Sequence, residues 1–224
     1  MRSLGNILDC VSFIETLQIQ GGEPFLYSDL AGLLDFCANQ KKIKHIVIAT
    51  NGTVMPSDDL LAVIKKHRVC IRISNYPVSK EKGLALQSCC KSLGIPNFIY
   101  NFAYRDAEWR DLGGIDTPRE DDAALVKRRF EECAFRGCLT LENGELNRCS
   151  RIYVAQTLQN FQKRADDHVD ATERHGLKRR LRRYVKNPTF AEACRYCHGT
   201  KDAKMIVPAE QPDTERHGEG ATEP

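Results

Sequence analysis

Apolar runs and amphipathic stretches alternate over the first hundred residues. Four apolar or β-branched runs predict strands, and the intervening periodicity of three to four predicts helices. Strands separated by helices of ten to fifteen residues are typical of βαβ units and a parallel sheet. The predicted strands are Leu17–Gln20, Ile43–Ala49, Val69–Ser74 and Ile95–Phe102. The predicted helices are Asp29–Gln40, a second helix that Ser57 or Asp58 caps at its start, and Lys80–Leu93, which ends at Gly94.

The residues before the first predicted strand have the pattern of a helix. Ile7, Leu8, Val11 and Ile14 repeat at helical spacing, so the chain starts on a helix, as if a preceding strand were missing. Such a sheet would have an exposed edge.

The second half has a different pattern. We expect a loop over residues 104–122, a helix over 122–132 and a hairpin turn at Asn143-Gly144. The basic run Arg174–Lys186 holds seven Lys and Arg and no acid, and its apolar positions predict a helix with Leu177, Leu181, Tyr184 and Val185 facing the core. Binding of RNA or an acidic peptide is the alternative for this run. We expect domains at 1–122 and 123–200 and a disordered acidic tail at 201–224.

Composition narrows the class of protein. The 224-residue chain is 42% hydrophobic with a net charge of +3, and it has no run long enough to cross a membrane and no signal peptide, so we expect a cytoplasmic protein. Ten cysteines in a reducing compartment favour metal binding over disulfides. Cys37, Cys70, Cys89 and Cys90 fit buried, inert thiols.

Polar residues follow three of the predicted strands. Ligands of parallel α/β sheets bind at the carboxyl ends of strands, where glycines allow close approach and hydroxyl, amide and carboxylate groups form hydrogen bonds. Each segment alone also fits a simple turn. The candidate binding residues are Gly21, Gly22, Glu23 and Pro24, then Thr50, Asn51 and Gly52, then Ser74 and Asn75.

Five cysteines of the second half have the spacing of metal ligands. Thiolates in a CxxC pair can reach one zinc or iron–sulfur centre. A structural zinc site and unrelated free thiols are the alternatives, and His198 could be a zinc ligand. The candidate ligands are Cys133, Cys138, Cys149, Cys194 and Cys197, of which one is in excess for a four-ligand centre, either Cys133 or Cys138.

These segments together resemble radical S-adenosylmethionine (SAM) enzymes with a C-terminal auxiliary cluster. The likeness rests on LQIQGGEPFLYSDLAGLLDFC, IVIATNGT and IRISNYP, and on Cys133-x10-Gly144-x4-Cys149, which resembles a SPASM or twitch domain. It implies an α/β fold: a partial parallel (β/α) barrel lacking its first strand, plus a small Cys-rich α+β domain with one auxiliary [4Fe–4S] cluster. It also implies that Gly21–Pro24 contacts the methionine amino group of SAM, and that the Thr-Asn-Gly and Ser-Asn positions line the SAM pocket.

The family's CxxxCxxC motif, which holds the SAM-cleaving cluster, has no counterpart in this sequence. We therefore expect either an N-terminally truncated enzyme or a degenerate relative. The intact form would cleave SAM reductively and modify a peptide or small molecule, with a flavodoxin or ferredoxin as possible reductant. The alternative is a non-catalytic iron–sulfur or zinc-binding partner protein. We expect neither membrane nor nucleic-acid binding.

Overall fold

A four-stranded parallel sheet forms the N-terminal half of the computed structural model, which describes residues 1–74, 76–100, 109–114, 116–153, 162–201 and 203–207. The strand order is β1-β2-β3-β4, and neighbouring strands follow one another in the chain. Ile19 pairs with Ile48, and Ile48 pairs with Ile71, so the central rows of the sheet are β-branched. The strands are β1 (Ile14–Ile19), β2 (Ile43–Thr50), β3 (Cys70–Ser74) and β4 (Asn97–Tyr100).

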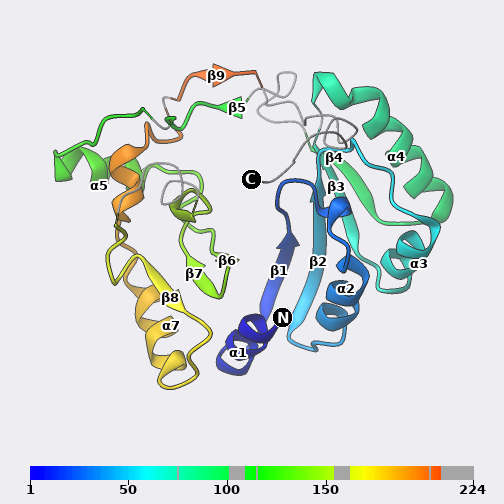
Figure 1. Cartoon of the computed structure of the whole chain (residues 1–224), viewed down its shortest axis with the longest axis horizontal. Helices are drawn as coiled ribbons and strands as arrows, with labels where there is room; N and C mark the ends of the chain where they lie inside the picture. Colours follow the sequence, from blue (N-terminus) through cyan, green and yellow to red (C-terminus); the bar gives the residue numbers. More distant parts are fainter. Residues whose placement is uncertain (75, 101–108, 115, 154–161, 202, 208–224) are drawn as a thin grey trace, which may run out of the picture.

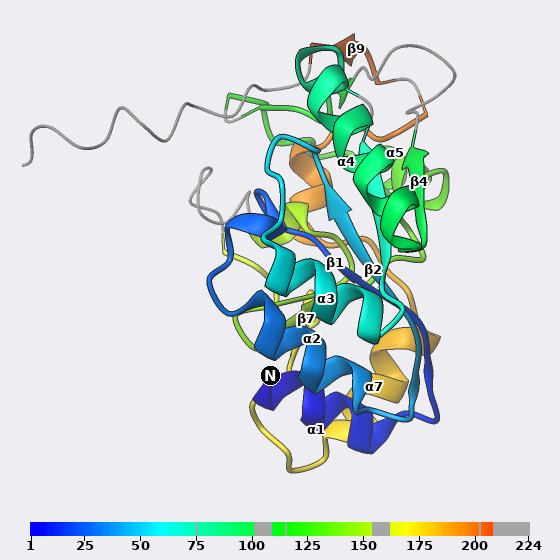
Figure 2. The ribbon, with the colours of Figure 1, turned by 90° about the vertical axis from the view of Figure 1, so that its right-hand side faces the viewer.

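Three helices cover one face of this sheet, which Figures 1 and 2 show from two directions. They are α2 (Leu30–Ala38), α3 (Asp58–Lys66) and α4 (Lys80–Leu93), and the short 3₁₀ helices η1 (Pro24–Leu26) and η2 (Pro77–Ser79) lie in the connections. Burial of apolar area between helices and strands supplies the main stabilisation of such a layer. The central buried side chains are Leu30, Leu34, Ile48, Leu61, Ile64, Ile71, Ile73 and Leu86.

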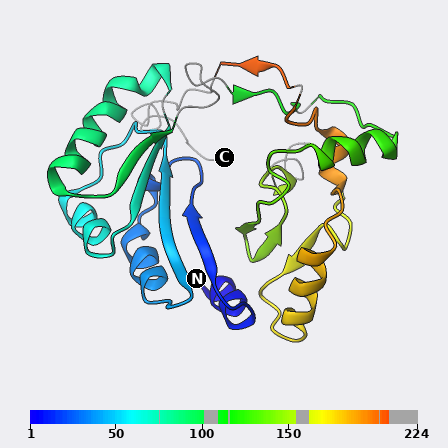
Figure 3. The ribbon, with the colours of Figure 1, turned by 180° about the vertical axis from the view of Figure 1, so that it is seen from behind.

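The opposite face of the sheet carries no helix of its own among the described residues, and it faces the C-terminal half (Figure 3). Side chains alternate along a strand, so residues between the core positions lie on this face. Parallel sheets are usually apolar on both faces, whereas this one is mixed. We call it the open face, and define it by Thr16, Gln18, His45, Val47, Ala49, Cys70, Arg72, Ser74, Phe98 and Tyr100.

The C-terminal half is built from short elements. A three-stranded antiparallel sheet, β6-β7-β8, packs on a basic helix, and a pair of two-residue strands, β5 and β9, links the two halves at one end. The elements are β5 (Trp109–Arg110), α5 (Ala123–Glu131), β6 (Thr140–Glu142), β7 (Glu145–Asn147), β8 (His168–Asp170), α7 (Leu177–Lys186), η3 (Glu192–Tyr196) and β9 (Met205–Ile206).

Helix α1 (Arg2–Cys10) joins the two halves at their other end. Leu4 and Leu8 pack beside the N-terminal sheet, whereas Ile7 packs with the cluster beneath α7. The buried Asn6 side chain donates a hydrogen bond to the carbonyl of Ala171 at 2.9 Å. The first helix is therefore part of the contact between the halves.

The predicted α/β fold with a parallel sheet and its helices is confirmed, and several local predictions hold as well. Ser57 caps α3, Gly94 ends α4 with a left-handed conformation, and Asn143-Gly144 forms the β6–β7 turn with positive φ at both residues.

Other local predictions were wrong. The strand predicted from Leu17 begins at Ile14, which pairs with Ile43, so Ile14 belongs to β1 and not to the first helix. Part of the predicted 104–122 loop forms β5, and Met205 and Ile206, assigned to the acidic tail, form its partner β9. On α7, Val185 is 53% exposed instead of facing the core. Among the described residues, no helix is both long and apolar enough to cross a membrane.

Candidate functional site

Glu23 connects the loop after β1 to the end of β2. Its buried carboxylate accepts hydrogen bonds from the Thr50 hydroxyl at 2.8 Å, from the Asn51 backbone N–H at 2.9 Å and from the Phe25 backbone N–H at 3.2 Å. Each donor would be costly to leave unpaired inside the protein. Glu23 therefore positions the two strand-end loops relative to each other.

The glycines of the two loops differ in what the fold requires of them. Gly52 has φ +74°, and a Cβ atom there would lie 2.9 Å from the Cα of Gly83, so the chain conformation itself demands glycine. A Cβ atom at Gly21 or Gly22 would meet nothing within 4 Å. Open space beside these two glycines leaves their backbone accessible to a ligand.

The remaining strand-end candidates lie beside these loops. Thr50 is buried and also accepts a hydrogen bond from the Gly52 N–H at 3.0 Å, and the Asn51 side-chain oxygen accepts from the Thr53 N–H at 2.8 Å, as in a turn. Ser74 ends β3 and is buried, Pro24 is buried at the start of η1, and Asn75 lies outside the described residues.

An aromatic pair joins this edge of the sheet to the C-terminal half. The rings of Tyr76, after β3, and Trp109, in β5, meet edge to face with centroids 6.0 Å apart. Such pairs stabilise a contact beyond simple area burial. The strand-end loops and the β5–β9 link are therefore adjacent.

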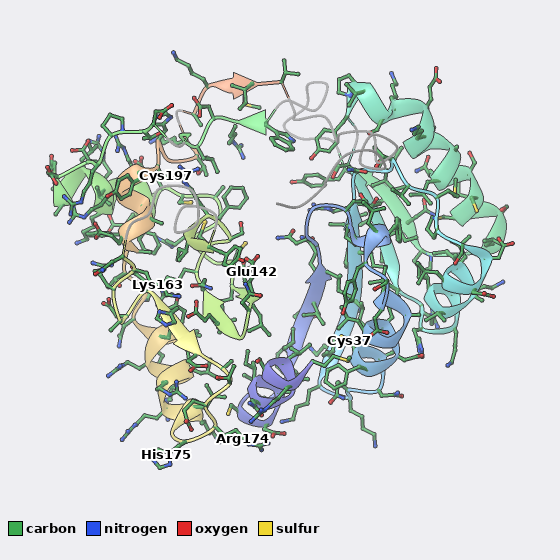
Figure 4. All side chains as sticks on the ribbon, in the orientation of Figure 1. Cys37, Glu142, Lys163, Arg174, His175 and Cys197 are labelled. Atoms are coloured by element: carbon green, nitrogen blue, oxygen red, sulfur yellow. The ribbon has the colours of Figure 1, made fainter. Side chains whose placement is uncertain are left out.

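Four of the five candidate cysteines line one cavity of about 50 Å³ in the C-terminal half. Figure 4 shows Cys197 in this half, far from Cys37 in the helical layer outside the sheet. The fifth candidate, Cys138, is exposed and does not line the cavity. The four cavity thiols belong to Cys133 after α5, Cys149 after β7, Cys194 in η3 and Cys197 at the end of η3.

Backbone N–H groups lie close to the cavity sulfurs. The Phe135 N–H donates to the Cys133 sulfur at 3.4 Å, and the Gly199 N–H donates to the Cys197 sulfur at 3.3 Å. Burial raises the pKa of the Cys149 and Cys194 thiols, and backbone hydrogen bonds offset part of this rise. Donors aimed at sulfur favour the thiolate, which is the form that binds metals and clusters.

Burial opposes ionisation of these thiols in the metal-free chain. Desolvation raises the pKa of Cys149 to about 11 and that of Cys194 to about 12, and it raises the pKa of Cys197 as well. The thiols are near enough to one another that a negative charge on one raises the pKa of the next. A bound cation or cluster would compensate these costs and release protons.

Arginines surround the cavity, and the sequence analysis missed them. Arg129, Arg136, Arg148 and Arg151 line it, and none of the lining residues that the structure describes is acidic. The Arg151 side chain donates to the carbonyl of Tyr196 at 2.9 Å, which fixes the loop of the CxxC pair. Arg148 and Arg151 flank Cys149 in the sequence, so the sequence alone could have indicated arginines near this cysteine. Positive surroundings favour a thiolate-bound, negatively charged centre.

The spacing of the metal-binding side chains and two comparisons with known proteins bear on the identity of this site. Among the described residues, no three Cys, His, Asp or Glu side chains are grouped closely enough to hold a single metal ion. The sequence matches no protein-family model and no curated protein.

Proposed function

We propose that this chain is an iron–sulfur protein of the radical SAM type, in which Cys133, Cys149, Cys194 and Cys197 hold one auxiliary [4Fe–4S] cluster. The observation that carries the proposal is the convergence of these four thiols on one cavity from separate elements. Cys138, which is exposed outside the cavity, is then the spare cysteine of the five.

The chemistry of the cavity supports a thiolate-ligated cluster. Its lining combines four thiols with apolar side chains, including Ile152, Ala191 and Ala193, and with arginines that offset negative charge. Hydrogen bonds to the sulfurs and exclusion of water are the levers by which proteins tune such clusters. When bound, the cluster would supply electron transfer or a fixed iron for substrate placement.

In this proposal the N-terminal half is the partial (β/α) barrel of the radical SAM type. The open backbone at Gly21 and Gly22 would receive the methionine end of SAM, while Glu23 keeps the loops in place through Thr50 and Asn51. Because the sequence has no CxxxCxxC, reductive cleavage of SAM is assigned only to a form of the protein that contains this motif. That form would modify a peptide or small molecule and take electrons from a flavodoxin or ferredoxin.

Anaerobic reconstitution tests the cluster. The purified chain is incubated with ferrous iron, sulfide and a thiol reductant, desalted, and assayed for iron, acid-labile sulfide and zinc. We expect about four irons and four sulfides per chain, and a reduced cluster visible by electron paramagnetic resonance. Replacing Cys133, Cys149, Cys194 or Cys197 singly by Ser should remove most of the iron.

Cys138→Ser is the matched control, because it changes a neighbouring cysteine outside the cavity. It should retain full iron content. One bound zinc with no retained iron would replace the cluster by a structural zinc site. If Cys138→Ser lost as much iron as the cavity variants are expected to lose, and Cys133→Ser loaded iron fully, the ligand assignment would be wrong.

A further inference from the structure

Arg72 is a charged residue in the middle of a strand of the parallel sheet. Its neighbours along β3, Ile71 and Ile73, are buried in the helix-covered core, so alternation places Arg72 on the open face. Across the sheet it pairs with Ala49 on β2 and Phe98 on β4. An interior position of a parallel strand is normally apolar, so this cation needs a physical explanation.

The charge of Arg72 is not balanced within the described part of the chain. Its Nε atom is buried and donates no hydrogen bond, and no carboxylate there forms an ion pair with its guanidinium. The guanidinium lies over the Tyr100 ring, 4.7 Å from the centroid, an arrangement that attracts the cation but offers Nε no hydrogen-bond acceptor. Nε therefore presents an unused donor next to an aromatic ring.

The surroundings of Arg72 suit an anionic ligand. Phe98 and Tyr100 on the adjacent strand are 43% and 39% exposed, so the face around Arg72 is accessible from solvent. None of the residues that define the open face is acidic. The small side chain of Ala49 flanks Arg72 on the other side, and Gln18 lies on the same face as a further polar group.

We infer that Arg72 binds the carboxylate or phosphate group of a substrate on the open face of the sheet. The guanidinium fork suits both groups, since each offers paired oxygens. Arg72 precedes Ser74 at the strand end by two residues, or about 7 Å, which places the anion below the strand-end loops. That the anion belongs to a substrate rests on the proposed function, whereas the anion site itself does not.

The test follows the Nε–H signal of Arg72 by NMR in the full-length, reconstituted chain. The probes are inorganic phosphate, succinate and S-adenosylhomocysteine, each titrated at constant ionic strength. We expect a saturable shift of the Arg72 signal with phosphate or with succinate, and the stronger probe identifies the class of anion. Arg72→Lys should weaken this binding by about tenfold, because lysine lacks the bidentate fork. Binding to the lysine variant is measured by calorimetry.

Arg179→Gln is the control, since it removes an exposed arginine of α7 and should leave binding unchanged. Arg72→Met should keep its iron content and have an unchanged or higher urea midpoint, because it leaves the buried Nε donor out and breaks no ion pair of the described residues. A clearly lower midpoint would mean that Arg72 has a structural role and would overturn the inference. Absence of a saturable shift with phosphate and succinate would overturn it too, and a response to S-adenosylhomocysteine alone would reassign the anion to the cofactor.

Iron content separates this inference from the proposed function. Saturable anion binding in a chain that takes up no iron would leave the anion site intact and remove the iron–sulfur assignment. Full iron loading without anion binding would support the iron–sulfur assignment and remove the anion site.

Discussion

At the scale of single residues, the buried Glu23 carboxylate satisfies donors from three positions. Thr50 and Asn51 donate to it across the gap between the ends of β1 and β2, and Phe25 donates from within the loop after β1. A buried acceptor of this kind stabilises the fold mainly because its removal would leave buried hydrogen-bond donors without a partner. The carboxylate is therefore a structural requirement of the strand-end loops, whatever ligand the loops bind.

Replacing Glu23 by Ala should lower the free energy of unfolding by about 1–3 kcal/mol, since buried donors at Thr50 and Asn51 lose their acceptor. Urea denaturation followed by circular dichroism measures the change. Glu15→Ala is the control, because Glu15 forms only exposed ion pairs, with Lys44 and His45, and their loss should cost less than about 1 kcal/mol. Equal effects of the two substitutions would contradict the assigned role of Glu23.

At the scale of elements, α1 links the two halves of the molecule. One side of it packs beside β1, and Ile7 on another side joins the cluster formed by Leu146, Val169 and Leu177. The β6–β7–β8 sheet and α7 are short, so they bury little apolar area by themselves. The packing of α1 therefore contributes a large share of the stability of the C-terminal half.

Ile7→Ala should destabilise the chain by about 2–5 kcal/mol, because it creates a cavity between α1 and α7. The loss should appear in urea denaturation and also as faster hydrogen exchange in β7 and β8. Leu84→Ala on α4 removes an apolar side chain that is 45% exposed, and it should change stability by no more than about 0.5 kcal/mol. Exchange rates in β7 and β8 that stay unchanged in Ile7→Ala would show that α1 does not support this half.

At the scale of the whole molecule, the stability of the metal-free chain depends on the protons of its buried thiols. Burial raises the pKa of Cys149 to about 11 and of Cys194 to about 12, whereas an unfolded cysteine ionises near pH 8.5. Between these values the folded state holds more protons than the unfolded state. The stabilising contribution is then complete below about pH 8.5 and is lost as the pH rises toward 12.

We expect the free energy of unfolding of the reduced, metal-free chain to fall between pH 9 and pH 11, by up to about 1.4 kcal/mol per pH unit for each such thiol. Urea titrations at intervals of one pH unit measure the slope. The double variant Cys149→Ala and Cys194→Ala should have a shallower slope, and Cys138→Ala should match the unmodified chain. If the free energy of unfolding fell with pH at the same rate in the unmodified chain, the double variant and Cys138→Ala, the cavity thiols would not be the cause of the loss of stability at alkaline pH.

The sequence by itself determined the features that depend on neighbouring residues. The order of strands and helices, the Ser57 cap, the Gly94 helix end and the Asn143-Gly144 turn follow from periodicity and from local backbone preferences, which act over a few residues. The likeness to radical SAM enzymes also came from the sequence alone, and it stays a prediction.

Tertiary structure decided the features that depend on residues far apart in the chain. Two-residue strands such as β5 and β9 have too little local preference to form without each other, so neither was predicted. Spacing left Cys133 and Cys138 equivalent, and only the packing of α5 and η3 placed one in the cavity and the other in solvent. Arg72 likewise became a candidate anion-binding residue only in the folded structure, where its neighbours on β2 and β4 are known and no described residue pairs with its charge. The sequence could not show this, because electrostatic compensation depends on proximity in space.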